Sequence, residues 1–279
     1  MFARVEPMHL PDGFLSTLVS VVFWVLSILS LAVALKRVGK DLGERQMPLM
    51  GVLAAAIFAG QMLNFTVAGG TSGHLLGATL ATILLGPWAA MIVMTTVVSI
   101  QALIFQDGGL LALGTNLFNM GMIGVTISFF IHTSIQKLAG GRRWGIFIGG
   151  GVAAWFSIVA AALAAALQLA LSGTSPANIA IPAMGGVHML IGIGEGLITF
   201  GALVFLYSAR RDLLKIEDTE PKGGKAVWVG GLAMAVLLAI LSPLASSHPD
   251  GLEWVAGQNG FLEAARAPLF NVIPEYIFP

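Results

Sequence analysis

The sequence predicts an all-α protein, a polytopic bundle of transmembrane helices, from its composition and from its long apolar runs. Hydrophobic residues make up 57% of the 279 residues and charged residues only 10%, whereas a soluble domain carries about 25% charged residues. The mean hydropathy is +0.89. We therefore expect membrane lipid, not water, to cover most of the folded surface.

Seven apolar runs reach the length of roughly 20 residues that a helix needs to cross a bilayer. They are approximately residues 15–35, 48–67, 87–105, 109–131, 145–171, 186–208 and 226–245. An eighth stretch, 66–85, is interrupted by glycines and is followed by the turn Gly86-Pro87. We expect it to be a short or broken span, because unwound backbone is tolerated at membrane depth only beside protein or a cavity.

The basic residues test this count, since Arg and Lys collect on the cytoplasmic side of a membrane. Apart from Arg4 and Arg266, the 14 basic residues form three groups, at 36–45, 137–143 and 210–225. Eight spans, the broken one included, place all three groups on one side. The sequence thus predicts a multi-pass protein of the cell inner (cytoplasmic) membrane, with its N-terminus and its tail 246–279 extracytoplasmic.

The predicted organisation has three parts: a seven-span transmembrane core at 1–211, a charged cytoplasmic linker at 212–225, and a module at 226–279 with one further span and an external tail. The first residues hold both acidic and basic side chains, which does not fit a cleaved signal peptide. We therefore expect the first span to be retained.

Composition also excludes several classes of function. The chain has no cysteine, so thiolate metal sites and cysteine nucleophiles are excluded. A formal net charge of zero argues against nucleic acid as a partner. The sequence has no Gly-rich Lys-Ser/Thr phosphate loop, so this chain is not expected to hydrolyse ATP itself.

Two of the five histidines, His9 and His74, are predicted to lie near the external face at the ends of spans. Imidazole is a frequent ligand of nickel, cobalt, copper and zinc. If Met8 were the first residue, its amine, the deprotonated His9 amide, the His9 ring and a His74 nitrogen could form a square plane, which suits Ni(II) or Cu(II). The alternatives are that both histidines are plain interfacial residues and that Pro11-Asp12-Gly13 is only a turn before a helix.

A series of short motifs resembles one family, the substrate-binding subunit (S component) of energy-coupling-factor (ECF) nickel/cobalt transporters, the CbiM/NikM family. The resemblance covers about residues 8–210. It is carried by Met8-His-Leu-Pro-Asp-Gly-Phe14, Gly73-His-Leu-Leu-Gly77, Leu84-Leu-Gly-Pro-Trp88, Gln101, Phe105-Gln-Asp-Gly-Gly109, Leu113-Gly-Thr-Asn116, Asn119-Met120, His188, Ile191-Gly192 and Glu195.

The resemblance implies a seven-span fold that captures Ni²⁺ or Co²⁺ as transported ion, with no permanently bound cofactor. It assigns the metal ligands to Met8, His9 and His74. It also implies separate ATPase subunits, a transmembrane coupling (T) subunit and a small accessory membrane subunit as partners. Residues 1–7 depart from the family pattern, and we expect them to be an over-called start.

The last part of the chain resembles a second module. Ser242-Pro243, followed by His248-Pro-Asp-Gly-Leu-Glu-Trp254, is similar to the PDGLE-type domain, which is related to the accessory (N) subunit of these transporters.

Polar residues inside the predicted spans are candidates for support of the site. Asn64, Gln101 and Asn116, with Gln61 and Asn119, are expected to orient the histidine rings, or else to form interhelical hydrogen bonds. His188 and Glu195 lie two helical turns apart on one face, and we assign them to structure or gating. Asp12 and Asp107 are expected to be external turn residues, and His248 a surface residue.

Two other functions stay open at this point. A stand-alone secondary metal-ion permease would need intramembrane acids, and only Glu195 qualifies clearly. An intramembrane metal-dependent hydrolase lacks a His-Glu-x-x-His pair. Because imidazole titrates near 6.5, ion binding is expected to be lost below about pH 6.

Overall fold

The computed structural model describes residues 8–39, 46–214 and 245–268, and the fold in these ranges is a helical bundle. Five of its helices are long and apolar enough to cross a membrane. They are α1 (Thr17–Val38), α4 with its extension η2 (Pro87–Phe105), the continuous helix α5–η3–α6 (Leu113–Leu138), α7 (Arg143–Leu171) and α8 (Ala177–Ala209). The shorter α2 (Gln46–Gln61) is also apolar. The expected all-α class is confirmed, and the predicted span at 226–245 lies almost wholly outside the described residues.

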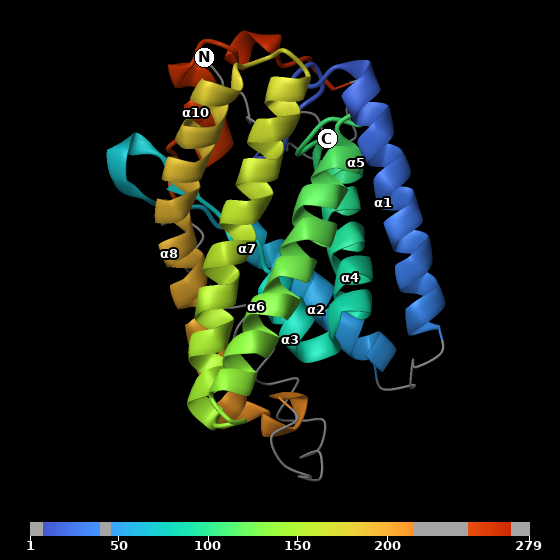
Figure 1. The fold of residues 1–279 in the computed structure, drawn as a ribbon, viewed down its shortest axis with the longest axis vertical. Coiled ribbons are helices and arrows are strands. Elements are labelled where there is room, and N and C mark those ends of the chain that lie inside the picture. The colour runs from blue at the N-terminus through green and yellow to red at the C-terminus, as the bar shows by residue number, and fades with distance from the viewer. Residues whose placement is uncertain (1–7, 40–45, 215–244, 269–279) are drawn as a thin grey trace, which may run out of the picture.

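The helices run between two opposite ends of the bundle (Figure 1). The C-terminal end of α1, the α6–α7 turn and the short helix η4 (Arg211–Leu214) lie together at one end. There the Arg143 guanidinium donates to the Tyr207 hydroxyl at 2.6 Å, and Arg211 lies 4.5 Å from the centroid of the same ring. The described members of the second and third basic groups therefore meet at this end, which we call the basic end.

The predicted broken span is indeed interrupted. It forms the two-residue strands β1 (Phe65–Thr66) and β2 (Ser72–Gly73), joined through the turn η1 (Ala68–Gly70), and then the eight-residue helix α3 (Ala78–Leu85). Gly77 (φ 78°) begins α3 and Gly86 (φ 82°) ends it, a left-handed backbone that favours glycine. Residues 71–73 of the unwound part are buried, whereas Ala68–Gly70 at the turn between the strands are exposed.

Two helices widen into π-helical turns on the way to the end opposite the basic one. These turns are η2 (Gln101–Phe105) and η3 (Leu117–Ile123), and α5 is the four residues Leu113–Asn116. π-helical turns are frequent at functional sites because they displace side chains from the regular helical positions. Here they bring polar side chains of two spans into the bundle interior.

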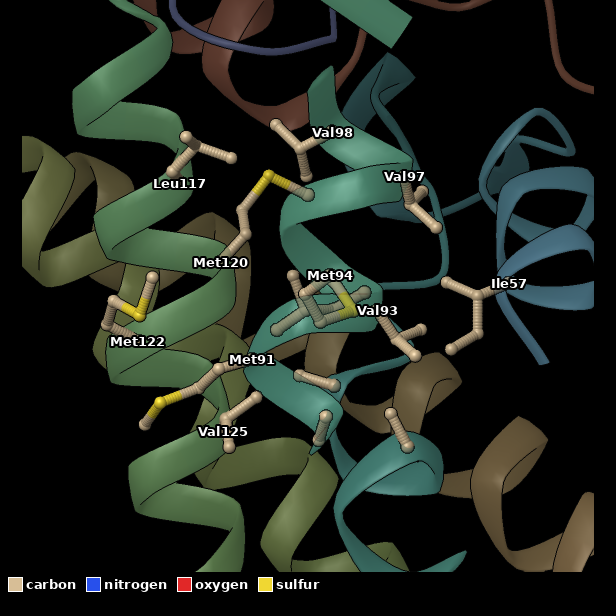
Figure 2. Packing of buried hydrophobic residues seen from close by; sticks show 14 of the residues in the cluster. Ile57, Met91, Val93, Met94, Val97, Val98, Leu117, Met120, Met122 and Val125 are labelled. Atoms are coloured by element: carbon tan, nitrogen blue, oxygen red, sulfur yellow. The ribbon is translucent and has the colours of Figure 1, made fainter. Parts of the chain in front are cut away.

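Methionine and β-branched side chains fill the centre of the bundle (Figure 2). Met94 and Val97 of α4 lie among Ile57 of α2 and Met120 and Met122 of η3, and all of them are buried. Methionine adapts to irregular gaps, which suits a core built around two π-helical turns. Outward-facing apolar residues of α1 and α8, such as Leu18 and Leu197, are exposed at 74% and 68%, as expected for surface that faces lipid.

Residues 245–268, which we call the C-terminal segment, lie across the end of the bundle opposite the basic end (Figure 1). They form α10 (Gly251–Gln258) and η6 (Leu262–Ala264). Their apolar side chains share a buried cluster with Leu10 and Phe14 of the chain before α1. Both termini of the described chain thus meet over the same end.

Candidate metal site

His9 and His74 lie together at the end opposite the basic one. His9 precedes α1, and His74 is in the loop between β2 and α3. Their rings meet edge to face, with centroids 5.6 Å apart and an interplanar angle of 71°. A cavity of about 80 Å³ lies beside them, and Met8, Asn116, Asn119, His188 and Asp250 are among its lining residues. The three predicted ligand residues therefore line one pocket.

Asp107 holds His9 from the turn that follows η2. The His9 backbone N–H donates to Asp107 Oδ1 at 3.1 Å, and His9 Nδ1 lies 3.4 Å from the Asp107 carbonyl oxygen and 3.5 Å from Oδ2. His9 Nε2 is buried without a hydrogen-bond partner. Asp107 lies in the turn that the sequence predicts, but its side chain is buried, with an exposure of only 5%.

The chain just after His9 is held by two more polar residues. Asn116 accepts from the Leu10 N–H and donates to the Leu10 carbonyl, both at 3.1 Å. Asp12 accepts from three consecutive backbone N–H groups at 110–112, over 2.8–3.1 Å. Asn116 was expected to orient the histidine rings, but its two hydrogen bonds go to the Leu10 backbone beside His9. Asp12, expected in an external turn, is buried.

The His74 loop is fixed by polar side chains from three spans. Glu195 of α8 is fully buried and accepts from the N–H groups of Leu76 (2.7 Å) and Gly77 (3.1 Å). Gln61 donates to the Leu76 carbonyl at 2.8 Å, and Gln101 in turn donates to Gln61 at 2.8 Å. These hydrogen bonds offset much of the cost of burying the carboxylate and the amides, although Gln101 Oε1 has no partner.

None of the remaining predicted polar residues forms a hydrogen bond with the ring of His9 or His74. His188 donates through Nδ1 to the Met184 carbonyl at 2.8 Å. Asn119 pairs with Gln168 across two helices at 2.6 and 2.8 Å. Asn64 leaves its side-chain oxygen without a partner, and its backbone carbonyl accepts from Ser246. His188 and Glu195, although predicted on one helical face, bond to different partners.

A second carboxylate reaches the site from the C-terminal segment. Asp250 Oδ1 lies 3.1 Å from His74 Nδ1, and its side chain is 4% exposed. Burial tends to lower the pKa of His74, but the Asp250 charge and hydrogen bond outweigh it and raise that pKa. Burial tends to raise the pKa of Asp250, but its charge interaction and hydrogen bond with His74 outweigh burial and lower that pKa. Burial lowers the pKa of His9, because the attraction of Asp107 only partly opposes it.

Sequence reasoning missed the three aspartates, although a signal for them was present. Asp12, Asp107 and Asp250 are each followed by glycine, which predicts a turn. All three turns lie at the same end of the bundle, where the carboxylates bond to backbone N–H groups or to histidine. The turn signal was correct, but it does not tell whether a turn residue points into solvent or into a pocket.

Comparison with known proteins identifies the family. Residues 9–213 match the family described as the cobalt uptake substrate-specific transmembrane region, and residues 225–271 match the PDGLE domain. A putative fused nickel transport protein NikMN of Archaeoglobus fulgidus is 35% identical over 275 residues, which cover 98% of this chain and 89% of that protein. The fused nickel transport protein NikMN of Rhodobacter capsulatus is 31% identical, over 94% of this chain and 79% of its own.

Solved structures agree with these sequence matches. The crystal structure of a transition metal transporter superposes with a TM-score of 0.64 at 36% identity, covering 72% of this chain and 92% of that one. A truncated transition metal transporter gives a TM-score of 0.63 at 36% identity, over 72% and 98% of the two chains. The chain therefore belongs to the CbiM family of substrate-specific transmembrane regions and is a multi-pass membrane protein that carries a PDGLE domain behind this region.

Proposed function

We propose that this chain is the ion-capturing subunit of an ATP-driven, ECF-type transporter that takes up Ni²⁺ or Co²⁺. The observation that carries the proposal is the contact of the His9 and His74 rings in a buried pocket at one end of a membrane bundle. Two imidazoles without thiolates suit borderline ions such as nickel and cobalt. The relatives described above, named as nickel transport proteins, support the same ion class.

The proposed ligands are the Met8 amine, the His9 amide and ring, and a ring nitrogen of His74. Within the described ranges, no group of three or more His, Cys, Asp or Glu side chains has the spacing of a metal site. This favours main-chain nitrogens as part of the ligand set. The Asp107 carboxylate already accepts the His9 amide hydrogen, so we propose that it takes up that proton when the amide binds the ion.

The amine ligand requires a chain that begins at Met8. In a chain with residues 1–7 attached, the Met8 nitrogen is an amide, and the ring nitrogens of His9 and His74 would bind the ion without it. Comparing the two forms therefore tests the chelate separately from the role of the histidines.

Transport needs further subunits under this proposal. The sequence has no phosphate loop. Under this proposal, separate ATPase subunits hydrolyse ATP and a T subunit couples that hydrolysis to transport. We assign the basic end to the cytoplasmic side by the positive-inside rule, so that under this proposal the His9–His74 pocket opens on the extracytoplasmic side of the inner membrane. The division into core, linker 212–225 and PDGLE module 226–279 is part of the same proposal.

Vesicle uptake tests the coupling. Vesicles holding the chain with its ATPase and T subunits are expected to take up ⁶³Ni²⁺ or ⁵⁷Co²⁺ only with internal ATP, and the chain alone is expected to show none. Uptake by the chain alone, driven by an ion gradient, would establish a secondary permease instead. The Glu195 carboxylate is already engaged by two backbone N–H groups, which argues against it as a freely exchanging coupling acid.

A further inference from the structure

The C-terminal segment is attached to the core beside the loop that carries His74. Ser72 N–H donates to the Pro249 carbonyl at 2.8 Å, and Ser72 Oγ donates to the His248 carbonyl at 2.9 Å. The Thr71 hydroxyl also reaches the Pro249 carbonyl at 3.2 Å. These bonds run along the two residues before Asp250, so they set where its side chain begins.

The position of Asp250 is fixed from its other side as well. Its carbonyl accepts from the Trp254 N–H at 2.8 Å as the first bond of α10. The next residue, Gly251, lies so close to α8 that an added Cβ would be 2.6 Å from Ile191 and 3.1 Å from His188. Asp250 is thus held between the His74 loop and α8 with little freedom to move.

The contact with His74 has a direct consequence for that ring. A carboxylate only accepts hydrogen bonds, so the hydrogen between Asp250 Oδ1 and His74 Nδ1 belongs to Nδ1. In the neutral ring this leaves the lone pair at Nε2. A carboxylate bonded to one ring nitrogen while the other binds metal is the usual support of a histidine ligand, since it fixes ring orientation and tautomer.

We propose that Asp250 is a positioning residue for ion capture, through which the PDGLE module completes the site built by the core. Its carboxylate orients the His74 ring with Nε2 as the ion ligand. This inference rests on the proposed function, since it assumes that His74 binds the ion. It assigns the module a part in ion affinity in addition to its attachment to the core.

The test is ion binding by variants of the full chain at about pH 8, where protons compete little with imidazole. Co²⁺ is the probe, because its visible absorption reports the geometry of the ligands. Asp250→Ala is expected to weaken Co²⁺ binding by about 10–100-fold and to change the absorption spectrum. Asp250→Asn retains an acceptor oxygen for Nδ1–H and is expected to recover part of the loss.

Two controls separate positioning from attachment. Glu263→Gln removes an exposed carboxylate from the same segment and is expected to bind Co²⁺ as the parent does. Because the chain has no cysteine, a Ser72→Cys, His248→Cys pair can report attachment by disulfide cross-linking. The cross-link is expected to form equally well with and without Asp250→Ala.

The outcomes are distinct. Binding by Asp250→Ala that equals or exceeds that of the parent would overturn the inference, and so would loss of the cross-link together with loss of binding. If His74→Ala binds as tightly as the parent, the proposed function fails first. If His74→Ala loses binding while Asp250→Ala keeps it, only the role of Asp250 fails.

Discussion

The His9 and His74 rings face each other edge to face with centroids 5.6 Å apart, although His9 precedes α1 and His74 lies in the loop between β2 and α3. His74 Nδ1 is hydrogen-bonded to Asp250 of the C-terminal segment, whereas Asp107, in the turn after η2, bonds to the His9 backbone N–H and lies beside the His9 ring. The paired carboxylates also place negative charge beside the pocket, which favours a divalent cation.

Asp107→Asn is expected to weaken Ni²⁺ binding by about 10–100-fold, the range seen when the support of a metal-bound histidine is removed. The variant retains an acceptor for the His9 N–H but loses the negative charge that assists removal of the amide proton. Asp212→Asn, which removes a partly exposed carboxylate paired with Arg210, is the matched control. Isothermal titration calorimetry measures the Ni²⁺ affinity of both variants. Equal affinities in the two variants would contradict a role for Asp107.

Glu195→Ala is expected to lower the unfolding midpoint and to weaken ion binding. It leaves the Leu76 and Gly77 N–H groups buried without an acceptor, at a cost of about 1–3 kcal/mol for each. Glu195→Gln retains one acceptor oxygen and should fall between alanine and the parent. Leu197→Ala, at a position 68% exposed on the same helix, should leave both properties unchanged. Thermal unfolding in detergent provides the comparison, and a stable Glu195→Ala variant would refute this assignment.

Gly109→Ala is expected to destabilise the N-terminal attachment by about 1–3 kcal/mol, the usual cost of overpacking. An added Cβ would overlap the backbone nitrogen and the side chain of Asp12. Gly201→Ala is the matched control, because no atom lies within 4 Å of its added Cβ, and alanine favours a helix over glycine. Cleavage by protease near residue 9 should rise in Gly109→Ala and not in Gly201→Ala. The reverse order would be inconsistent with the packing described.

Ion retention is expected to fall as the pH is lowered, over a range set by His74. Burial tends to lower the pKa of His74, but Asp250, with Asp107 and Glu195, raises it above the ordinary 6.5. A nitrogen ligand must lose its proton before it binds metal, so a raised pKa means that proton competition begins at a higher pH. The titratable groups that influence His74 are Asp250, Asp107, Glu195, His9 and His188.

Retention of Ni²⁺ between about pH 8 and 5 measures this effect. With free Ni²⁺ kept well below the Kd of each protein, we expect the midpoint to lie at a higher pH in the parent chain than in Asp250→Asn. The midpoint is lower in Asp250→Asn because this variant lacks the negative charge that raises the His74 pKa. Full retention at about pH 5 would count against nitrogen ligands altogether.

Much of the fold could be predicted from sequence because lipid imposes simple rules on length and charge. The apolar runs predicted the long helices, the glycines around Gly70 marked the interruption, and Arg143 and Arg211 of two basic groups meet at one end. The contacts of the aspartates could not be predicted in this way. Asp107 reaches His9 across 98 positions and Asp250 reaches His74 across 176, and no periodicity connects residues so far apart.

The polar residues in the spans show a similar division. Intramembrane polar groups are expected to pair with each other or with backbone, and Gln61, Gln101 and Glu195 do so around the His74 loop. Which partner each one chooses depends on the unwound backbone between β2 and α3, whose exposed N–H and carbonyl groups attract them. Helical spacing placed His188 and Glu195 on one face of α8, but it could not show that each bonds to a different partner.

The most direct measurement is Ni²⁺ and Co²⁺ binding to purified protein beginning at Met8, beside the 279-residue form and the variants His9→Ala and His74→Ala. The account predicts one ion bound by the Met8 form and loss of binding in each histidine variant. Equal binding by the full-length form would exclude the Met8 amine as a ligand and would leave the two histidines as the proposed ligands. Unchanged binding in both histidine variants would contradict the central claim that the ion is captured between His9 and His74.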